Sequence, residues 1–126
     1  VKGVISLNFR DSTPIYEQIK NSFRELIIGG IMQPDEKLPS VRELASELSL
    51  NPNTIQRAYT ELEAEGYIYS IQGKGNYVSV REYVSGDRKE RLLRNFVEIA
   101  TELIFLGEKP EDLRKLIGAK EKEFND

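Results

Sequence analysis

Apolar residues at helical spacing predict a first helix that begins at Pro14 and ends before Gly29 and Gly30. Thr13 suits the position that caps this helix, and Pro14 suits the first helical position because the N–H that it lacks would have no partner there. The apolar face of the helix consists of Ile15, Ile19, Phe23, Leu26 and Ile27. Ahead of the helix, a weak alternation of apolar and polar residues over positions 4–9 predicts a short strand.

Two further helices are predicted one shortly after the other, with a turn at residues 49–51 between them. The first begins at Ser40 and runs to Leu48. It opens with a capping box, in which the Ser40 hydroxyl and the Glu43 carboxylate each accept a backbone N–H. The second spans residues 52–65 and is closed by a glycine. Its apolar stripe consists of Ile55, Ala58, Tyr59 and Leu62.

Two strand-like runs rich in Tyr, Ile and Val follow at residues 67–71 and 76–80. The residues between them, 72–75, include two glycines that permit positive φ, which is typical of a hairpin. The order from residue 13 to residue 80 is therefore helix, helix, short turn, helix, hairpin. This order predicts a mainly α fold with a small β-hairpin wing, which is a winged helix-turn-helix domain over residues 1–81.

The apolar pattern changes from about Ser85, where a heptad-like seam with a second stripe beside it predicts a long helix. The seam consists of Leu92, Phe96, Ile99, Leu103 and Leu106, and the second stripe consists of Leu93, Val97, Ala100 and Ile104. Pro110 begins a last helix, with acidic residues in its first turn that suit the helix dipole.

Two adjacent stripes make an apolar face wider than a solitary surface helix can cover. We therefore expect residues 82–126 to form a two-helix dimerisation tail, with one stripe packed within the chain and the other across a twofold axis. The residues assigned to the dimer interface are Leu92, Leu93, Phe96, Ile99, Leu103 and Ile104. The alternative is that both stripes pack onto the winged helix of the same chain.

Composition and charge narrow the classes of function. The chain has no His and no Cys, which removes the usual general base near neutral pH and the commonest metal ligands, so we expect no enzyme, metal or cofactor. No apolar run approaches the roughly 18 residues of a membrane span, and we expect a cytoplasmic protein without a membrane partner. The net charge is −3, with 9 basic and 10 acidic side chains up to Arg81 and 9 basic and 11 acidic beyond it. Binding to nucleic acid would therefore need a focused patch.

Polar residues crowd the first turn of the helix at 52–65, away from its apolar stripe. In a helix-turn-helix protein this end of the second helix lies nearest the base edges of the major groove. Asn and Gln bond adenine, Arg bonds guanine, and Thr meets a thymine methyl or a phosphate. The candidates for DNA contacts are Asn53, Thr54, Gln56 and Arg57. The spacing from Ala45 to Ile55 is that of a helix-turn-helix, although Ser49 stands where such turns often place Gly. The alternative is a polar cap on an ordinary surface helix.

Further candidates for DNA contacts lie outside this helix. Gln72, Gly73 and Lys74 form a slim, basic tip that suits a minor groove or a phosphate, the alternative being a plain hairpin turn. Arg42, at the start of the helix that Ser40 caps, suits a phosphate or a base, the alternative being an ion pair within its own helix.

Three segments, PIYEQI, LPSVRELASELSLNPNTIQRAYTELEAEGYI and GKGNYV, together resemble the GntR family of bacterial transcription regulators over about residues 13–80. The resemblance implies a winged helix that binds operator DNA as a dimer. The residues to which it assigns DNA contacts are Arg42, Asn51, Asn53, Thr54, Gln56, Gln72 and Gly73. Pro52 stands where some members carry a DNA-contacting Arg, so that contact is absent here, and Arg57 is expected to clamp a phosphate rather than to read a base.

The tail resembles that of the small YtrA-like subgroup, whose two C-terminal helices mainly dimerise. About 45 residues follow the wing, and two helices are too few to enclose a metabolite pocket of roughly 300 Å³ or more, so the existence of an effector stays open. The expected function is that of a homodimeric repressor that binds a near-palindromic operator through helix 52–65 and wing 67–80. The alternative is a winged-helix protein-interaction module without DNA binding, which the negative net charge would suit. The polar, cationic face favours DNA, because protein interfaces usually have an apolar centre.

Overall fold

The computed structural model describes residues 5–125, apart from the side chain of Glu82, and the predicted order of elements is confirmed from the first helix onward. The chain divides into two compact units, one ending at Ser85 and one starting at Gly86. The elements are α1 (Ile15–Ile28), α2 (Val41–Leu48), α3 (Pro52–Glu65), β1 (Ile68–Ile71), β2 (Gly75–Val78), a short 3-10 helix η1 (Arg81–Tyr83), α4 (Gly86–Phe105) and α5 (Pro110–Asn125). Among the described residues no helix is long and apolar enough to cross a membrane.

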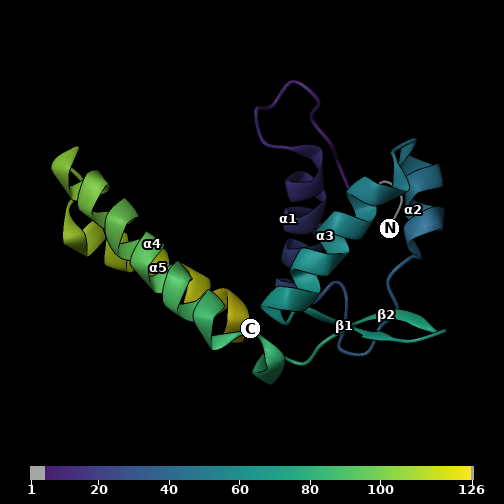
Figure 1. Cartoon of the computed structure of the whole chain (residues 1–126). Helices are drawn as coiled ribbons and strands as arrows, with labels where there is room; N and C mark the ends of the chain where they lie inside the picture. Colours follow the sequence, from purple (N-terminus) through teal and green to yellow (C-terminus); the bar gives the residue numbers. More distant parts are fainter. Residues whose placement is uncertain (1–4, 126) are drawn as a thin grey trace. The chain divides into compact units, whose positions relative to one another are not determined.

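The core of the first unit lies where α1 crosses α3, with α2 packed beside the N-terminal end of α3 (Figure 1). Phe23 of α1 meets Tyr59 of α3 edge to face, with ring centroids 5.6 Å apart. The Tyr59 hydroxyl donates to the Pro39 carbonyl at 2.8 Å, and burial raises the pKa of Tyr59, so the phenol keeps its proton. The predicted apolar faces of α1 and α3 are thus the faces that the core uses, and they fix which residues of α3 remain outside.

Two predictions at the start of the chain are wrong. Residues 5–9 of the segment predicted as a strand form no strand, and residue 4 lies outside the described residues. The backbone of Asn8 instead exchanges two hydrogen bonds with the Gln18 side chain, at 2.8 and 2.9 Å, so it has no need of a partner strand. Thr13 does not cap α1: the cap position belongs to Pro14, which offers no side-chain hydrogen bond.

The predicted helix starts of the helix-turn-helix are confirmed. The Ser40 hydroxyl accepts the Glu43 N–H at 3.1 Å at the start of α2, which is one half of the predicted capping box; the Glu43 carboxylate does not accept the Ser40 N–H. Asn51 caps α3 by accepting the Asn53 N–H at 2.8 Å. Ser49, in the turn between the two helices, has the left-handed φ of 56° that makes Gly common at this place.

The hairpin is paired on its outer side by a short segment that sequence patterns missed. Lys37 forms an isolated antiparallel bridge with Tyr77 of β2, and the Leu38 N–H donates to the Asn76 carbonyl at 2.9 Å. The Tyr69 hydroxyl of β1 donates to the Asp35 carboxylate at 2.7 Å, and this hydrogen bond raises the pKa of Tyr69. These bonds hold the wing against the body of the first unit.

Gly66, at the end of α3, packs against the segment that follows the wing in the chain. Its φ is 89°, and an added Cβ would lie 2.0 Å from the Tyr83 carbonyl oxygen. The Ser85 N–H also donates to the Glu65 carbonyl at 2.8 Å. The first unit therefore extends to Ser85, past the predicted boundary after Arg81, because residues 81–85 pack on the end of α3.

We expect Gly66→Ala to lower the free energy of unfolding by about 2–4 kcal/mol, because it combines a strained backbone with a backbone clash. Gly30→Ala is the matched control, since Gly30 has a similar φ of 76° with nothing within 4 Å of an added Cβ. It should cost about 1 kcal/mol. Urea denaturation of the two variants measures the difference. Equal losses in the free energy of unfolding would mean that the clash with Tyr83 does not contribute.

A ladder of charged side chains ties α1 to α3 on one side of the core. Glu65, with 10% of its side chain exposed, pairs with Arg24 at 2.8 Å and with Lys20 at 3.3 Å. Lys20 also bonds Glu61 at 2.8 Å. Burial lowers the pKa of Lys20, but the hydrogen bond that Lys20 donates to Glu61 and the charge of Glu65 outweigh it and raise that pKa overall.

We expect Glu65→Gln to lower the free energy of unfolding by about 3 kcal/mol, because it leaves Arg24 near the core without its carboxylate and leaves Lys20 with Glu61 alone. Glu63→Gln, an exposed acid two positions earlier on the same helix, is the matched control and should change stability by less than about 0.5 kcal/mol. Chemical denaturation at pH 7 measures both. A loss at Glu65 no larger than at Glu63 would mean that the ladder does not stabilise the fold.

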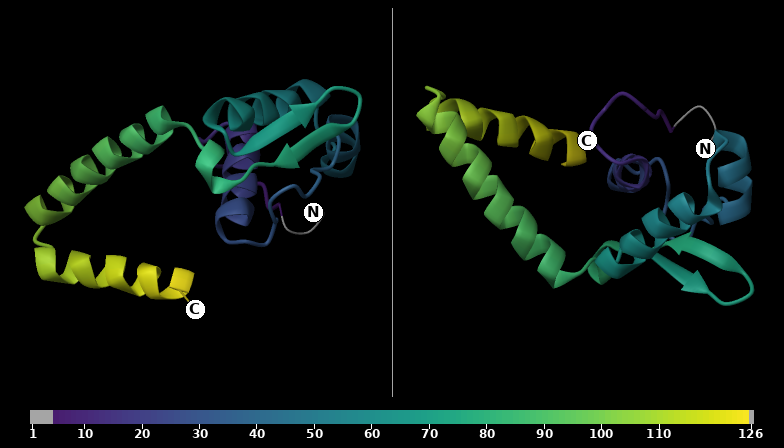
Figure 2. Two further views of the ribbon diagram at one scale, coloured as in Figure 1. Left: turned by 90° about the horizontal axis from the view of Figure 1, so that it is seen from below. Right: turned by 45° about the horizontal axis from the view of Figure 1, so that its top comes forward.

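The second unit consists of α4 and α5, which diverge from the turn at Gly107 (Figure 2). No described residue of either helix is buried. Of the six residues predicted to dimerise, Leu103 is half-buried and the other five are 43–61% exposed. Within the second unit by itself, the wide apolar face predicted from the two stripes is thus not buried.

Candidate nucleic-acid interface

The first turn of α3 places its polar side chains outside the core. Ile55 is fully buried, whereas Asn53, Gln56 and Arg57 are exposed and Thr54 is half-buried. Asn53 and Thr54 make no side-chain hydrogen bond with a residue that the structure describes. Both side chains are therefore available to a ligand. Gln56 donates to the Thr60 hydroxyl at 3.2 Å, a long bond that a base edge can replace.

Asn51 is committed in part, because its side-chain oxygen caps α3. The amide nitrogen of Asn51 is left for DNA, whereas its oxygen has one of its two lone pairs occupied by the cap. The resemblance-based assignment of a DNA contact to Asn51 therefore rests mainly on a hydrogen-bond donor.

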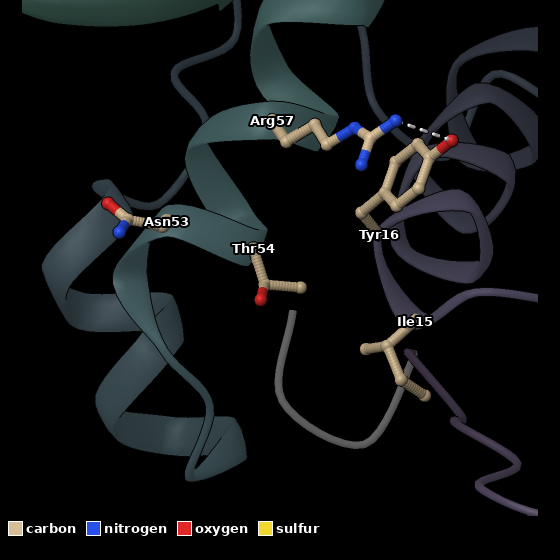
Figure 3. Close-up of a pocket in the computed structure, with 5 residues that line it drawn as sticks. All are labelled: Ile15, Tyr16, Asn53, Thr54 and Arg57. Carbon is tan, nitrogen blue, oxygen red and sulfur yellow. Dashed lines mark hydrogen bonds between the residues drawn. The ribbon is translucent and has the colours of Figure 1, made fainter.

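Arg57 is held in place by two neighbours. Its guanidinium carbon lies 3.7 Å from the centroid of the Tyr16 ring, and one NH₂ group donates to the Tyr16 hydroxyl at 3.1 Å (Figure 3). Its Nε donates to the Glu61 carboxylate at 3.4 Å. The hydrogen bond from Lys20 lowers the pKa of Glu61, so this carboxylate stays charged near neutral pH and keeps its hold on Arg57.

An open hollow of about 330 Å³ lies between the start of α1 and the start of α3. Its lining consists of Ile15, Tyr16, Asn53, Thr54 and Arg57. Figure 3 shows Arg57 reaching across to Tyr16, with Thr54 between the two helices. The hollow offers a cation, two hydroxyls and an amide, and no acid is among its lining residues.

Tyr16 was not among the predicted site residues. In the sequence it belongs to the helix that opens with Pro14, and nothing in its local pattern connects it to the other helix. The connection comes from the packing of α1 on α3, which brings together residues 41 positions apart. Only a signal for that pairing, such as the complementary charges of Lys20 and Glu61, would have pointed to it.

Arg42 lies exposed in the first turn of α2. The alternative of an ion pair within its own helix does not hold among the described residues, since none accepts a hydrogen bond or an ion pair from Arg42. The Arg42 guanidinium is thus available for a phosphate or a base.

The wing tip is exposed and points toward the same end of the unit as the start of α3 (Figures 1 and 2). The tip residues Gln72, Gly73 and Lys74 are all exposed, and Gly73 has the positive φ of 78° that the turn needs. Their side chains make no hydrogen bond to the described residues. The first turn of α3 and the wing tip, two of the sets predicted to bind DNA, therefore lie toward one end of one compact unit.

The sequence of the chain is similar to those of known bacterial regulators of transcription. Residues 15–78 match the family described as bacterial regulatory proteins, gntR family. The HTH-type transcriptional repressor YtrA of Bacillus subtilis is 54% identical over 76 residues, which make up 60% of this chain and 58% of the repressor. The matched part is thus less than two thirds of that relative's length.

Solved structures match both units of the chain. A transcriptional antiterminator from Listeria monocytogenes EGD-e has a TM-score of 0.81 at 31% identity, over 96% of this chain and 92% of that one. AraR(DBD), solved in complex with operator ORE1, has a TM-score of 0.52 at 32% identity, over 59% of this chain and 90% of that one. The fold of the first unit is therefore also that of a protein crystallised on its operator.

Proposed function

The chain belongs to the GntR family of bacterial regulatory proteins, and from this premise we propose that it is a sequence-specific DNA-binding regulator of transcription. The observation that carries the proposal is the shared direction of the first turn of α3 and the wing tip, both of which have polar side chains, such as Asn53 and Lys74, that bond to no residue in the described part of the chain. In a winged helix, this end of the recognition helix reads base edges in the major groove. Asn53, Thr54 and Gln56 are the proposed readers of bases.

We propose that backbone contacts come from Arg42 and Arg57, and that the wing tip reaches the minor groove or a phosphate through Gln72, Gly73 and Lys74. Phosphate contacts set the register of a protein on DNA, and base contacts select the sequence. The likeness to a repressor supports repression as the outcome of binding.

We propose further that the protein binds a near-palindromic operator as a homodimer. The support is the apolar face of α4, whose stripes are not buried within the second unit by itself. A second copy offers the same face, and a twofold axis pairs such faces with each other. Half-sites are expected about one helical turn apart or less.

A protein-interaction module without DNA binding is the competing function. Its support is the net charge of −3, which disfavours contact with a polyanion outside a focused patch. The exposed surface at the start of α3 is polar and cationic, whereas the centre of a protein interface is depleted of charge. Among the described residues, most of the exposed large hydrophobic side chains lie on the second unit, where the proposed partner is a second copy.

We propose no enzymatic role and no cofactor. Relatives are named as transcription regulators, and the chain lacks both His and Cys. As a regulator of bacterial genes it would act in the cytoplasm, where the DNA is. A small-molecule effector stays unassigned.

The test of DNA binding is fluorescence anisotropy with labelled duplex DNA at several salt concentrations. Each phosphate that a cationic side chain neutralises contributes about −0.9 to the slope of log K against log salt concentration. We expect a steep slope and competition by unlabelled duplex. Binding that does not depend on salt, or no binding by folded protein to any duplex, including ones selected from a random pool, would support the protein-interaction module instead.

A further inference from the structure

We infer that the hollow between α1 and α3 holds one phosphate of the DNA backbone, and that Tyr16 is a direct ligand of that phosphate together with Arg57 and Thr54. The inference rests on the proposed function and adds a residue of α1 to the interface. It also gives α1, which carries none of the predicted contacts, a role in placing α3 on the DNA.

The hydrogen-bond directions at Tyr16 carry the first step. The Tyr16 oxygen accepts a hydrogen bond from the Arg57 guanidinium at 3.1 Å. Its own proton is therefore left to donate, and no described residue accepts it. A phenol that accepts from a cation is a stronger donor, because hydrogen bonds in a chain polarise one another. A phosphate oxygen in the hollow would complete the chain from Arg57 through Tyr16.

The stacking of Arg57 on Tyr16 carries the second step. With its guanidinium 3.7 Å from the ring centroid and its Nε bonded to Glu61, Arg57 has its direction fixed before DNA arrives. Less side-chain freedom is then lost on binding. The Arg57 side chain is still 61% exposed, so it faces the ligand as well as its neighbours.

The local charge carries the third step. The ladder along α1 and α3 contains three cations, namely Lys20, Arg24 and Arg57, against the two anions Glu61 and Glu65. The carboxylates of Glu61 and Glu65 are the partners of Lys20 and Arg24, and Arg57 shares Glu61 at the longest distance of the ladder, 3.4 Å. The positive excess therefore falls at the hollow, where a phosphodiester carries one negative charge.

The Thr54 hydroxyl completes the site from the side of α3. It lines the hollow, is half-buried and makes no hydrogen bond with the described residues. A phosphate seated here would be bonded by α1 and α3 at once. The seat would fix how deeply the first turn of α3 enters the major groove, with Asn53 next to it.

The test is a methylphosphonate scan of a duplex that the wild-type protein binds, in which one backbone phosphate at a time is replaced by a neutral group. The variants are Tyr16→Phe, which keeps the ring and removes the hydroxyl, and Thr54→Val, which keeps the shape and removes the other hydroxyl. Tyr83→Phe is the matched control, because Tyr83 is 70% exposed and packs at the opposite end of α3. Thermal melting verifies that each variant is folded.

We expect Tyr16→Phe to weaken binding about tenfold on every sequence, the scale of one hydrogen bond to a charged group. At one phosphate in each half-site, the methylphosphonate should lower the affinity of the wild type by about tenfold or more. The affinity lost by Tyr16→Phe and Thr54→Val at that phosphate should be smaller than the loss in the wild type, by a factor of about five or more. Tyr83→Phe should behave as the wild type.

The outcomes distinguish failure of the phosphate site from failure of the proposed DNA-binding function. One outcome is that the wild type binds DNA, but every methylphosphonate lowers the affinity of Tyr16→Phe and Thr54→Val as much as that of the wild type. The proposed phosphate site is then wrong, and the proposed function stands. If the folded wild type binds no duplex, the proposed function fails and the seat fails with it.

Discussion

Phe96→Asp is expected to convert the protein from a dimer to a monomer and to weaken binding to its specific operator by about 10²–10⁴-fold. Phe96 is central to the α4 seam and is not buried within the second unit by itself, so in the proposed dimer the charge meets an apolar partner face. Burying an unpaired carboxylate at such a face costs a large amount of free energy, which opposes association of the two copies. The loss of operator affinity follows because two linked half-site contacts become independent ones.

Sedimentation velocity measures the mass, and anisotropy measures the affinity for a two-half-site duplex. Asn95→Asp is the matched control, since it places the same charge on an exposed residue of α4 beside the seam. It should stay dimeric. A dimeric Phe96→Asp protein with unchanged affinity would move the interface away from the α4 seam, and an unfolded one would mean that this face packs within the chain.

Asn53→Ala and Gln56→Ala are expected to relax base preference at separate positions of each half-site, by about 1–3 kcal/mol per lost bidentate contact. Both side chains are exposed at the start of α3, and neither is part of the core. Loss of such a contact removes the advantage of one base over the other three without removing phosphate contacts. Weak, non-specific binding and its salt slope should therefore change little.

The measurement is a specificity profile from selection and sequencing, run side by side for the wild type and each variant. Glu63→Ala is the matched control, because Glu63 is exposed near the far end of the same helix. It should keep the wild-type profile. If the profiles of Asn53→Ala and Gln56→Ala are also unchanged, neither residue reads a base, and their exposure is that of an ordinary helix cap.

The helices could be predicted because their signals are local. The cap at Ser40 and the stop at Gly66 act through neighbouring backbone groups, and the structure uses them as the sequence indicates. The predicted strand at 4–9 is wrong over its described part because a strand needs a partner, and Asn8 satisfies its backbone with the side chain of Gln18 instead. Thr13 suits a cap by type, but the cap position falls at Pro14.

The candidate interface could be predicted only for features that depend on one helix alone. The side chains of Asn53 and Gln56 are exposed because Ile55 and Tyr59 turn the other face of α3 into the core, which periodicity alone indicates. The contact of Arg57 with Tyr16 joins residues of two helices, and periodicity carries no information on which residues face each other across such a contact. The bridge of Lys37 to Tyr77 escaped prediction for the same reason.

The measurement that tests the central claim most directly is selection from a random duplex DNA pool at about 0.15 M salt, followed by sequencing of the bound fraction. We expect a near-palindromic motif whose half-sites lie about one helical turn apart or less. No enrichment from protein that is folded and dimeric would contradict a sequence-specific regulator. Enrichment of a single half-site without symmetry would contradict the dimer and leave the DNA-binding unit in place.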